Sequence, residues 1–165
     1  MKESFPVIDE RFVQFYAVKE RKVIVRFQKL HKDAIIPSYA TPGSVGVDFH
    51  CIKDTYIPSE AIVPVRTGLA VEMPWYMELQ LRPRSGISRQ YPGYITNSPG
   101  TIDPDYRGEI IFYMVNNDPR AVIHFNKGDR IAQGVFAPIF RPELVEAAEL
   151  TLTMRGARGH GSSGP

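Results

Sequence analysis

The sequence contains a single cysteine, Cys51, and this scarcity excludes two classes of protein. One thiol can form neither a disulfide within the chain nor a metal site built from cysteines, so we expect Cys51 to be a small core residue. Long hydrophobic runs are also missing, and the first residues are charged rather than apolar. The sequence therefore predicts no membrane span and no signal peptide, and a cytoplasmic location is expected.

An excess of charge of one sign is absent as well, because 20 Lys and Arg residues stand against 18 Asp and Glu residues. Proteins that bind long nucleic acids usually carry a strongly basic surface, and this balance argues against one. We therefore expect no nucleic-acid partner, and any polyanion that binds should be small and held locally.

Uninterrupted helical stretches have little room, since 14 prolines and 13 glycines divide the chain at short intervals. The pattern favours an all-β fold, a sandwich or barrel of about ten or eleven short strands. Alternating or continuous apolar residues place the clearest expected strands at residues 23–27, 46–51, 61–63, 67–71, 76–81, 91–96, 110–115, 121–125 and 130–140.

Some of these segments carry a more detailed expectation. Within 76–81, the alternation predicts one buried face that includes Leu79 and Leu81. The continuous apolar run at 110–115 predicts burial on both faces. Residues 144–154 have helical propensity but end in an alternating pattern, so helix and strand both stay open.

Residues 97–109, Asn-Ser-Pro-Gly-Thr-Ile-Asp-Pro-Asp-Tyr-Arg-Gly-Glu, concentrate turn formers, two aspartates, a tyrosine and an arginine between two strand-like segments. The Pro-Gly and Pro-Asp pairs are turn signals. The stretch therefore predicts a tight hairpin or corner that presents Asp103 and Tyr106 from a rigid sheet. An aspartate in a turn is by itself also typical of any exposed loop, so its meaning depends on the other segments.

Four further segments carry polar chemistry, and they are residues 43–48, 84–86, 128–133 and 155–164. Arg84, Ser85 and Gly86 offer a guanidinium, a hydroxyl and accessible amides, which suit a phosphate group. Read alone, this tripeptide is more typical of a solvated turn than of a phosphate site. The segment rich in glycine and serine at 155–164 is likewise typical of a terminal linker.

Taken together and in this order, the five segments resemble the motifs of the homotrimeric deoxyuridine triphosphatases (dUTPases), which hydrolyse dUTP to dUMP and pyrophosphate. The matching segments are Gly-Val-Asp48, Pro-Arg-Ser-Gly86, residues 97–109, Gly-Asp-Arg-Ile-Ala-Gln133 and residues 155–164. The resemblance implies a β-domain at residues 22–154, a C-terminal arm at 155–165 and an N-terminal extension at 1–21. Such an enzyme limits the incorporation of uracil into DNA and supplies dUMP.

The resemblance also implies a jelly-roll β-sandwich that forms trimers, with a flexible C-terminal arm closing over a site shared between subunits. Asp103 matches the catalytic aspartate, which activates a water for in-line attack on the α-phosphorus. Mg²⁺ is expected to be held by the triphosphate and by waters, with Asp48 orienting that water shell. The residues implied to bind phosphate are Arg84, Ser85, Gly86, Gln133, Arg155, Gly161, Ser162 and Ser163. Those implied to bind uracil and deoxyribose are Asn97, Gly100, Ile102, Tyr106 and His160.

Substrate specificity is implied to rest on shape, because the Tyr106 ring would pack against deoxyribose and leave no room for a 2′-hydroxyl. Two residues depart from the family's pattern: His160 stands where a phenylalanine usually stacks on uracil, and Ser163 replaces a threonine. A smaller, titratable ring predicts a weaker or pH-sensitive cap on the base. The alternative functions are a dCTP deaminase of the same fold and a non-catalytic trimer that binds nucleotide or protein.

Overall fold

The computed structural model describes residues 23–159, which form twelve β-strands and one short helix. In chain order the elements are β1 (Arg26–Lys29), β2 (Ser38–Tyr39), β3 (Gly46–His50), β4 (Thr55–Ile57), β5 (Ile62–Arg66), β6 (Leu69–Glu72), β7 (Met77–Arg82), α2 (Ser85–Gln90), β8 (Gly93–Ile95), β9 (Gly100–Ile102), β10 (Ile111–Asn116), β11 (Ile123–Phe125) and β12 (Arg130–Pro138). The expected all-β class is confirmed. Within this part of the chain, no helix has the length and apolar character needed to cross a membrane.

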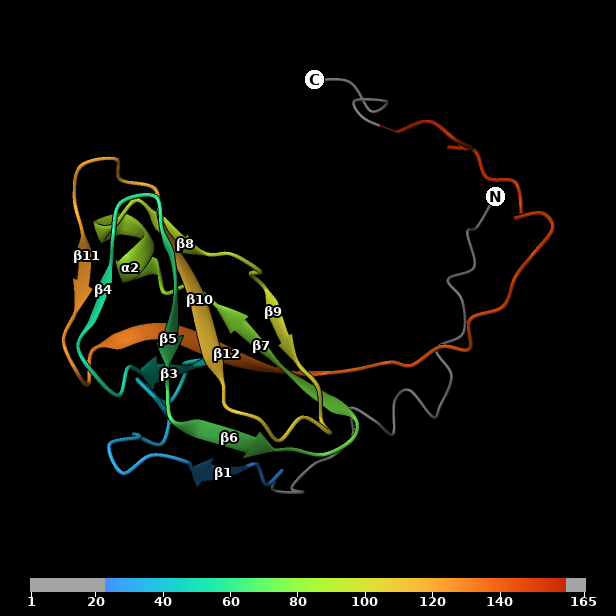
Figure 1. Cartoon of the computed structure of the whole chain (residues 1–165). Helices are drawn as coiled ribbons and strands as arrows, with labels where there is room; N and C mark the ends of the chain where they lie inside the picture. Colours follow the sequence, from blue (N-terminus) through green and yellow to red (C-terminus); the bar gives the residue numbers. More distant parts are fainter. Residues whose placement is uncertain (1–22, 160–165) are drawn as a thin grey trace.

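Antiparallel pairing joins the strands into four sheets. The largest has the order β2-β3-β12-β7-β9, and β5-β10-β8 forms a three-stranded sheet. Two-stranded ladders, β1-β6 and β11-β4, flank them, and α2 lies at one edge (Figure 1). Sheets that cross over one another in this way build the two-layered jelly-roll type of sandwich.

The hydrophobic core lies between the sheets because strand residues alternate between a buried and an outer side. On β7, Leu79 and Leu81 are 0% and 4% exposed, as the alternation predicts. On β3, Phe49 is fully buried, and its ring centroid lies 5.5 Å from that of Phe112 on β10, which joins the two larger sheets. Each such buried side chain contributes roughly 1.5–3 kcal/mol of stability. Cys51 is buried, as expected, and the alternate residues of β3 and β7 face away from the core.

The expected burial of residues 110–115 on both faces is wrong. Tyr113, in the middle of β10, is 48% exposed. Its neighbours on the same sheet, Ile62 of β5 and Tyr94 of β8, are also exposed. Among the described residues nothing covers the outer side of this three-stranded sheet, which leaves an apolar and aromatic face open in the single chain.

Residues 144–154 adopt neither of the two structures that their sequence left open. Strand β12 ends at Pro138, and the chain then runs away from the sheets (Figure 1). Leu144 and Leu152 are 90% and 100% exposed. Helical propensity over so short a stretch is too weak to form a helix without tertiary packing, and residues 23–159 leave the large apolar side chains of this segment exposed.

A buried asparagine joins three parts of the fold. Asn116, at the end of β10, is 0% exposed. Its Nδ2 donates to the backbone oxygens of Ile57 at 3.0 Å and Ala121 at 2.7 Å. Its Oδ1 accepts from the backbone N–H of Asp118 at 2.9 Å. One amide thereby satisfies three backbone groups at the junction of β4, β10 and the turn before β11.

Replacing Asn116 with alanine should lower the free energy of unfolding by roughly 2–4 kcal/mol, because the buried backbone groups lose their partners. Chemical denaturation of both proteins measures the difference. The neighbouring Asn117, whose side chain is exposed, provides the matched control, and its alanine variant should stay within about 0.5 kcal/mol of the wild type. Equal losses in the two variants would contradict the structural role given to Asn116.

Candidate functional site

The register of four neighbouring strands places polar side chains in a row. Gln133 of β12 lies opposite Asp48 of β3 on one side and Arg82 of β7 on the other. Ser38 of β2 lies opposite Asp48 in turn. Directly opposed residues of neighbouring strands point to the same face of a sheet. All four side chains therefore lie on the outer face, away from the core residues Phe49 and Leu81.

A pocket of about 370 Å³ opens over this row. It falls within the usual size range of small-molecule sites. Its lining comes from the segments 40–48, 82–85 and 133–135, and the residues are Ala40, Ser44, Val45, Gly46, Asp48, Arg82, Arg84, Ser85, Gln133 and Val135. The fold thus brings together four residues expected to act at the phosphates or the metal, namely Asp48, Arg84, Ser85 and Gln133.

Two guanidinium groups share one carboxylate at the side of this pocket. Arg84 Nε donates to Asp48 Oδ1 at 2.8 Å, and Arg130 Nη1 donates to Asp48 Oδ2 at 3.1 Å. The Asp48 side chain is 13% exposed, so the pairing is partly shielded from solvent. Two positive charges against one negative charge leave a net positive group that is held in place. Such an arrangement suits an anionic ligand because it is oriented before the ligand binds.

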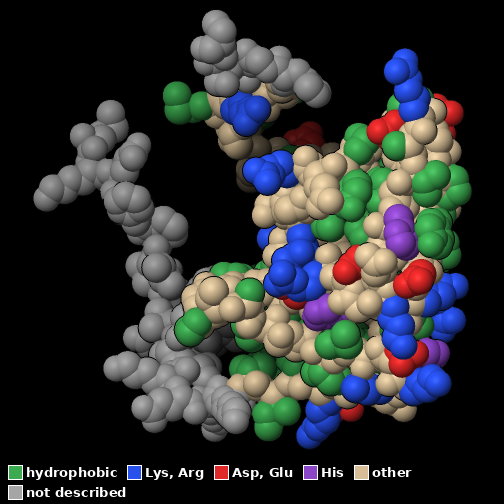
Figure 2. All heavy atoms as spheres, turned by 90° about the vertical axis from the view of Figure 1, so that its left-hand side faces the viewer, with side chains coloured by type: hydrophobic (Ala, Val, Ile, Leu, Met, Phe, Trp, Pro, Cys, Tyr) green, Lys and Arg blue, Asp and Glu red, His purple; other side chains and the backbone are tan. Residues whose placement is uncertain are grey.

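A histidine lies on the same face of β3, two residues after Asp48. Burial lowers the pKa of the His50 imidazole below its ordinary value, Arg130 and Arg84 act in the same direction, and Asp48 opposes them. The ring is therefore neutral at neutral pH. The positive charge of this region comes from the arginines alone, whereas charges of both signs are scattered over the side of the molecule that carries β4 and β11 (Figure 2).

The Gln133 side chain is held in a fixed orientation. Its Nε2 donates to the backbone oxygen of Pro83 at 2.8 Å, which ties β12 to the loop that carries Arg84. Gly46 provides the space: a Cβ at this position would lie 3.2 Å from Gln133 Cδ and closer still to Oε1. Gly46 lies opposite Val135, two residues beyond Gln133 in the ladder, and its missing side chain leaves room for the Gln133 amide against β3.

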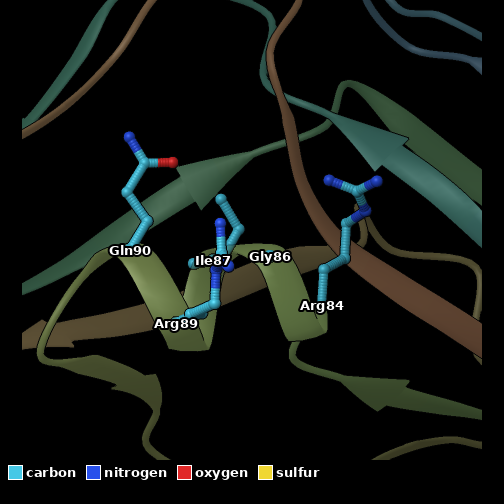
Figure 3. A pocket seen from close by; sticks show the side chains of 5 residues that line it. All are labelled: Arg84, Gly86, Ile87, Arg89 and Gln90. Atoms are coloured by element: carbon cyan, nitrogen blue, oxygen red, sulfur yellow. The ribbon is translucent and has the colours of Figure 1, made fainter.

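The segment after β7 turns directly into α2, whose N-cap, Arg84, has extended backbone angles of φ −89° and ψ 140°. A Cβ added at Gly86 would have no neighbour within 4 Å, so its backbone is open to a ligand. A second hollow of about 570 Å³ runs along the helix, lined by Arg84, Gly86, Ile87, Arg89 and Gln90. Figure 3 shows Arg84 at one end of α2, well apart from Arg89 and Gln90. Arg84 thus borders both hollows.

The segment with Asp103 and Tyr106 is a corner between two sheets, because β8 pairs with β10 whereas β9 pairs with β7. Asp103 follows β9, and a turn closes there as Tyr106 N–H donates to Asp103 O at 3.1 Å. Arg107 Nη1 locks the turn by donating to the oxygens of Pro104 and Tyr106, at 2.8 and 2.9 Å. Asp103 and Tyr106 are exposed on this rigid turn. Asn97, Gly100 and Ile102 lie in the same corner.

The chain does not bring this corner to the pocket by itself. In the β7–β9 ladder Ile102 lies opposite Leu79, so Asp103 follows near the start of β7. Ser85 lies beyond the other end of the same strand. About four residues of strand, or roughly 14 Å, therefore separate the two halves of the expected site. Figure 1 shows β9 running away from α2, in agreement with this register.

The expected residues of the C-terminal arm are only partly described. Arg155 is exposed, and its Nε donates to the backbone oxygen of Arg158 at 2.9 Å, away from the pocket. His160, Gly161, Ser162 and Ser163 lie outside the described residues, as does the N-terminal extension.

The residues present fit a metal ion only in an indirect way. Within residues 23–159, no group of three or more His, Cys, Asp or Glu side chains is arranged to hold a metal. Asp48 is engaged by two arginines, so this carboxylate is not a free direct ligand. A hydrated Mg²⁺ that arrives with its phosphate ligand fits this donor set, because Mg²⁺ commonly keeps waters and binds substrate phosphates.

Sequence reasoning did not assign roles to Arg82 and Arg130. Arg130 stands within the Gly-Asp-Arg-Ile-Ala-Gln segment, but its contact with Asp48 depends on the pairing of β12 with β3. Arg82 could have been found from the alternation of β7, which places it with Gln80 on the face opposite Leu79 and Leu81.

An all-β domain with a cation-lined pocket of this kind is suited to a phosphorylated ligand, and comparison with known proteins defines the class. The family model described as dUTPase matches residues 32–164. The deoxyuridine 5′-triphosphate nucleotidohydrolase of Hydrogenobaculum sp. is 46% identical over 145 residues, covering 87% of this chain and 98% of that protein. This chain belongs to the dUTPase family.

Solved structures agree on the fold. The dUTPase of Staphylococcus bacteriophage 80alpha, solved with dUPNHPP, has a TM-score of 0.80 and 25% identity, covering 86% of this chain and 99% of that chain. A point mutant of the dUTPase from phage phi11 of S. aureus, in which the coordination of a structural Mg(II) ion is described, has a TM-score of 0.71 and 23% identity, covering 76% of this chain and 97% of that chain.

Proposed function

We infer that this chain hydrolyses dUTP to dUMP and pyrophosphate, which removes dUTP as a precursor of uracil in DNA and supplies dUMP. The observation that carries the inference is the pocket in which Asp48, Arg84, Ser85 and Gln133 converge, within a chain that the dUTPase family model matches over residues 32–164. Three separate segments of the sequence supply these groups, so their convergence is a property of the fold.

The pocket is suited to the triphosphate. Arg84 supplies a charged donor, Ser85 a hydroxyl, Gly86 an open backbone and Gln133 an oriented amide. Preorganised donors of this kind stabilise the negative charge that shifts toward the leaving pyrophosphate during phosphoryl transfer. Because Asp48 already holds Arg84, little reorganisation is needed when the nucleotide binds.

Asp103 acts as the general base. Its carboxylate is exposed on a turn that backbone hydrogen bonds and Arg107 hold rigid. It accepts a proton from a water that attacks the α-phosphorus in line with the departing pyrophosphate. A positioned carboxylate and a water are sufficient for this displacement, and no covalent enzyme intermediate is required.

The catalytic unit is a homotrimer in which one subunit supplies Asp103 to the phosphate pocket of another. Two features of the single chain support this assembly. The two halves of the site lie at opposite ends of β7. The face on β5, β8 and β10 and the apolar side chains of residues 144–154 are exposed, and residues 23–159 of the same chain do not cover them. Exposed apolar patches of this kind are typical of protein interfaces.

The corner at residues 97–106 recognises the nucleoside. Backbone groups of residues 97–102 would pair with uracil, so that a base with another hydrogen-bond pattern leaves buried groups unpaired, at roughly 1–3 kcal/mol each. The Tyr106 ring packs against deoxyribose and excludes a 2′-hydroxyl. Arg155, Gly161, Ser162 and Ser163 close over the phosphates, and His160 lies against the base.

Mg²⁺ is the proposed metal, held by the triphosphate and waters, with Asp48 as the residue that orients the hydrated ion. When bound, it would neutralise charge on the phosphate oxygens. The cytoplasmic location expected from the sequence stays a prediction.

Pyrophosphate release measured with each deoxynucleoside triphosphate and Mg²⁺ tests the function. We expect turnover of dUTP alone, loss of activity when EDTA removes the metal, and recovery when Mg²⁺ is restored in excess. Ammonia released from dCTP would instead favour the deaminase. Binding of dUTP without turnover of any nucleotide would favour a non-catalytic protein.

A further inference from the structure

The ring of Tyr106 lies directly over the backbone of Gly108. A Cβ built on Gly108 would lie 2.5 Å from Tyr106 Cζ and 2.9 Å from Cε2, and closer still to the hydroxyl oxygen. Real Cβ atoms do not approach a ring carbon so closely. The φ angle of Gly108 is outside the left-handed region, so backbone strain does not explain the glycine. The glycine is needed because the aromatic ring occupies the space of a side chain.

A hydrogen bond holds the far end of the same ring. Tyr106 Oη donates to the backbone oxygen of Glu109 at 3.1 Å. The side chain therefore bends back over its own turn, with Gly108 beneath the ring and the Glu109 carbonyl at its tip. Tyr106 is nevertheless 43% exposed, so part of the ring stays free for a ligand.

The Glu109 backbone is itself anchored to the adjacent strands. Glu109 Oε2 accepts from Arg66 Nε at 2.9 Å and Nη2 at 2.7 Å, and Oε1 accepts from the backbone N–H of Gly68 at 2.7 Å. The Glu109 side chain is 12% exposed. Both guanidinium nitrogens donate to one carboxylate oxygen and the backbone N–H donates to the other, so charge-assisted bonds hold both oxygens of the side chain in place. The carboxylate thus joins the turn that carries Tyr106 to the β5–β6 connection.

We propose that Gly108 and the Arg66–Glu109 pair are positioning residues for sugar discrimination, acting through the Tyr106 ring. The inference rests on the proposed function, in which this ring packs against deoxyribose. Rejection of a 2′-hydroxyl by shape requires that the ring cannot move aside. Gly108 sets how closely the ring approaches the backbone, and the Glu109 carbonyl fixes its tilt. A ring displaced from this position would leave space for ribose.

A double-mutant cycle with two substrates tests this proposal. The measured quantity is selectivity, the ratio of kcat/KM for dUTP to kcat/KM for UTP, in the wild type, Gly108→Ala, Tyr106→Ala and the double variant. We expect Gly108→Ala to reduce selectivity about tenfold, mainly through KM, because a methyl group displaces the ring without touching the phosphate site. In the Tyr106→Ala background the same change should alter selectivity less than about twofold.

The outcomes separate the inference from the function on which it rests. Unchanged selectivity in Tyr106→Ala would refute the proposed role of the ring. Lost selectivity in Tyr106→Ala but not in Gly108→Ala would overturn the inference alone. An equal loss of selectivity from Gly108→Ala with and without the Tyr106 ring would also overturn the inference, because the effect of the substitution would then not depend on the ring.

A second variant keeps the test available if Gly108→Ala does not fold. Glu109→Gln keeps the backbone carbonyl and the shape of the side chain but removes the charge that binds Arg66. We expect a loss of selectivity of about threefold that disappears in the Tyr106→Ala background. Wild-type selectivity in a folded Glu109→Gln protein would exclude the Arg66–Glu109 pair from the role.

Discussion

Asp103→Asn is expected to lower kcat for dUTP about a thousandfold, in the range that removal of a general base produces, and to leave KM within about threefold. The amide has nearly the same shape as the carboxylate but cannot accept a proton from the attacking water. The turn should persist, because the bond that closes it uses the backbone oxygen of Asp103 and not the side chain. Single-turnover pyrophosphate release measures the chemical step, and calorimetry with dUTP and Mg²⁺ measures binding.

Asp105 provides a matched control in the same turn. Its side chain is also exposed, and the substitution Asp105→Asn removes the same charge two residues away. We expect this variant to keep kcat within about twofold of the wild type. If both variants lost activity to the same degree, the local charge and not the base at Asp103 would explain the effect. More than a tenth of wild-type kcat in Asp103→Asn would exclude Asp103 as the base.

Two inactive variants should restore activity when they assemble together. One carries Asp103→Asn, and the other carries Arg84→Ala with Ser85→Ala. If one subunit supplies the base and another the phosphate pocket, a mixed trimer contains some complete sites. In these sites the intact Asp103 comes from one variant and the intact pocket from the other. In a random one-to-one mixture, half of the phosphate pockets are intact, and half of those receive an intact Asp103 from the other subunit. About a quarter of the sites therefore contain both. Activity should therefore rise from below about 1% to roughly a quarter of the wild type.

Refolding the two chains together, or co-expressing them with different tags, gives the mixed trimers for the same pyrophosphate assay. The control pairs Asp103→Asn with a chain that carries all three substitutions, so that every site lacks the base and no recovery is expected. Activity no greater than the mean of the two parents, in assemblies shown to contain both tags, would mean that Asp103 and the pocket act within one subunit.

Local sequence pattern was sufficient for several of the strands and for the buried face of β7. Leu79 and Leu81 alternate with polar residues, and both are buried as predicted. The last strand, expected at residues 130–140, is observed at 130–138 and ends at Pro138. The first strand, expected at residues 23–27, is observed at 26–29, because the pairing with β6 and not the apolar run decides which residues are extended.

Local sequence pattern could not predict which strands pair with one another when they lie far apart in the chain. The pattern around residues 97–102 allowed a hairpin or a corner, and the distinction depends on β8 pairing with β10 while β9 pairs with β7. The error at residues 110–115 has a related cause. An apolar run indicates surfaces that favour burial, but it does not say what covers them, and Tyr113 is left 48% exposed by residues 23–159.

The site could be predicted as a set of residues but not as a geometry. The segments with Arg84 and Gln133 were recognised by their resemblance to family motifs, and the fold places them in one pocket. The contact of Arg130 with Asp48 and the fit of Tyr106 over Gly108 follow from tertiary packing. No spacing in the sequence encodes these distances, since they depend on strand register and on the path of a turn.

Trp75, the single tryptophan of the sequence, lies just before β7 and beside Arg141, which follows the end of β12. It is 64% exposed, the Arg141 guanidinium lies 5.7 Å from its ring centroid, and the neighbouring Tyr76 accepts a backbone bond from Ile139. Indole emission depends on the polarity and charge around the ring. The protein consequently contains an intrinsic fluorophore beside residues 139–141, and a change in the surroundings of this ring can be followed in real time without attaching a dye.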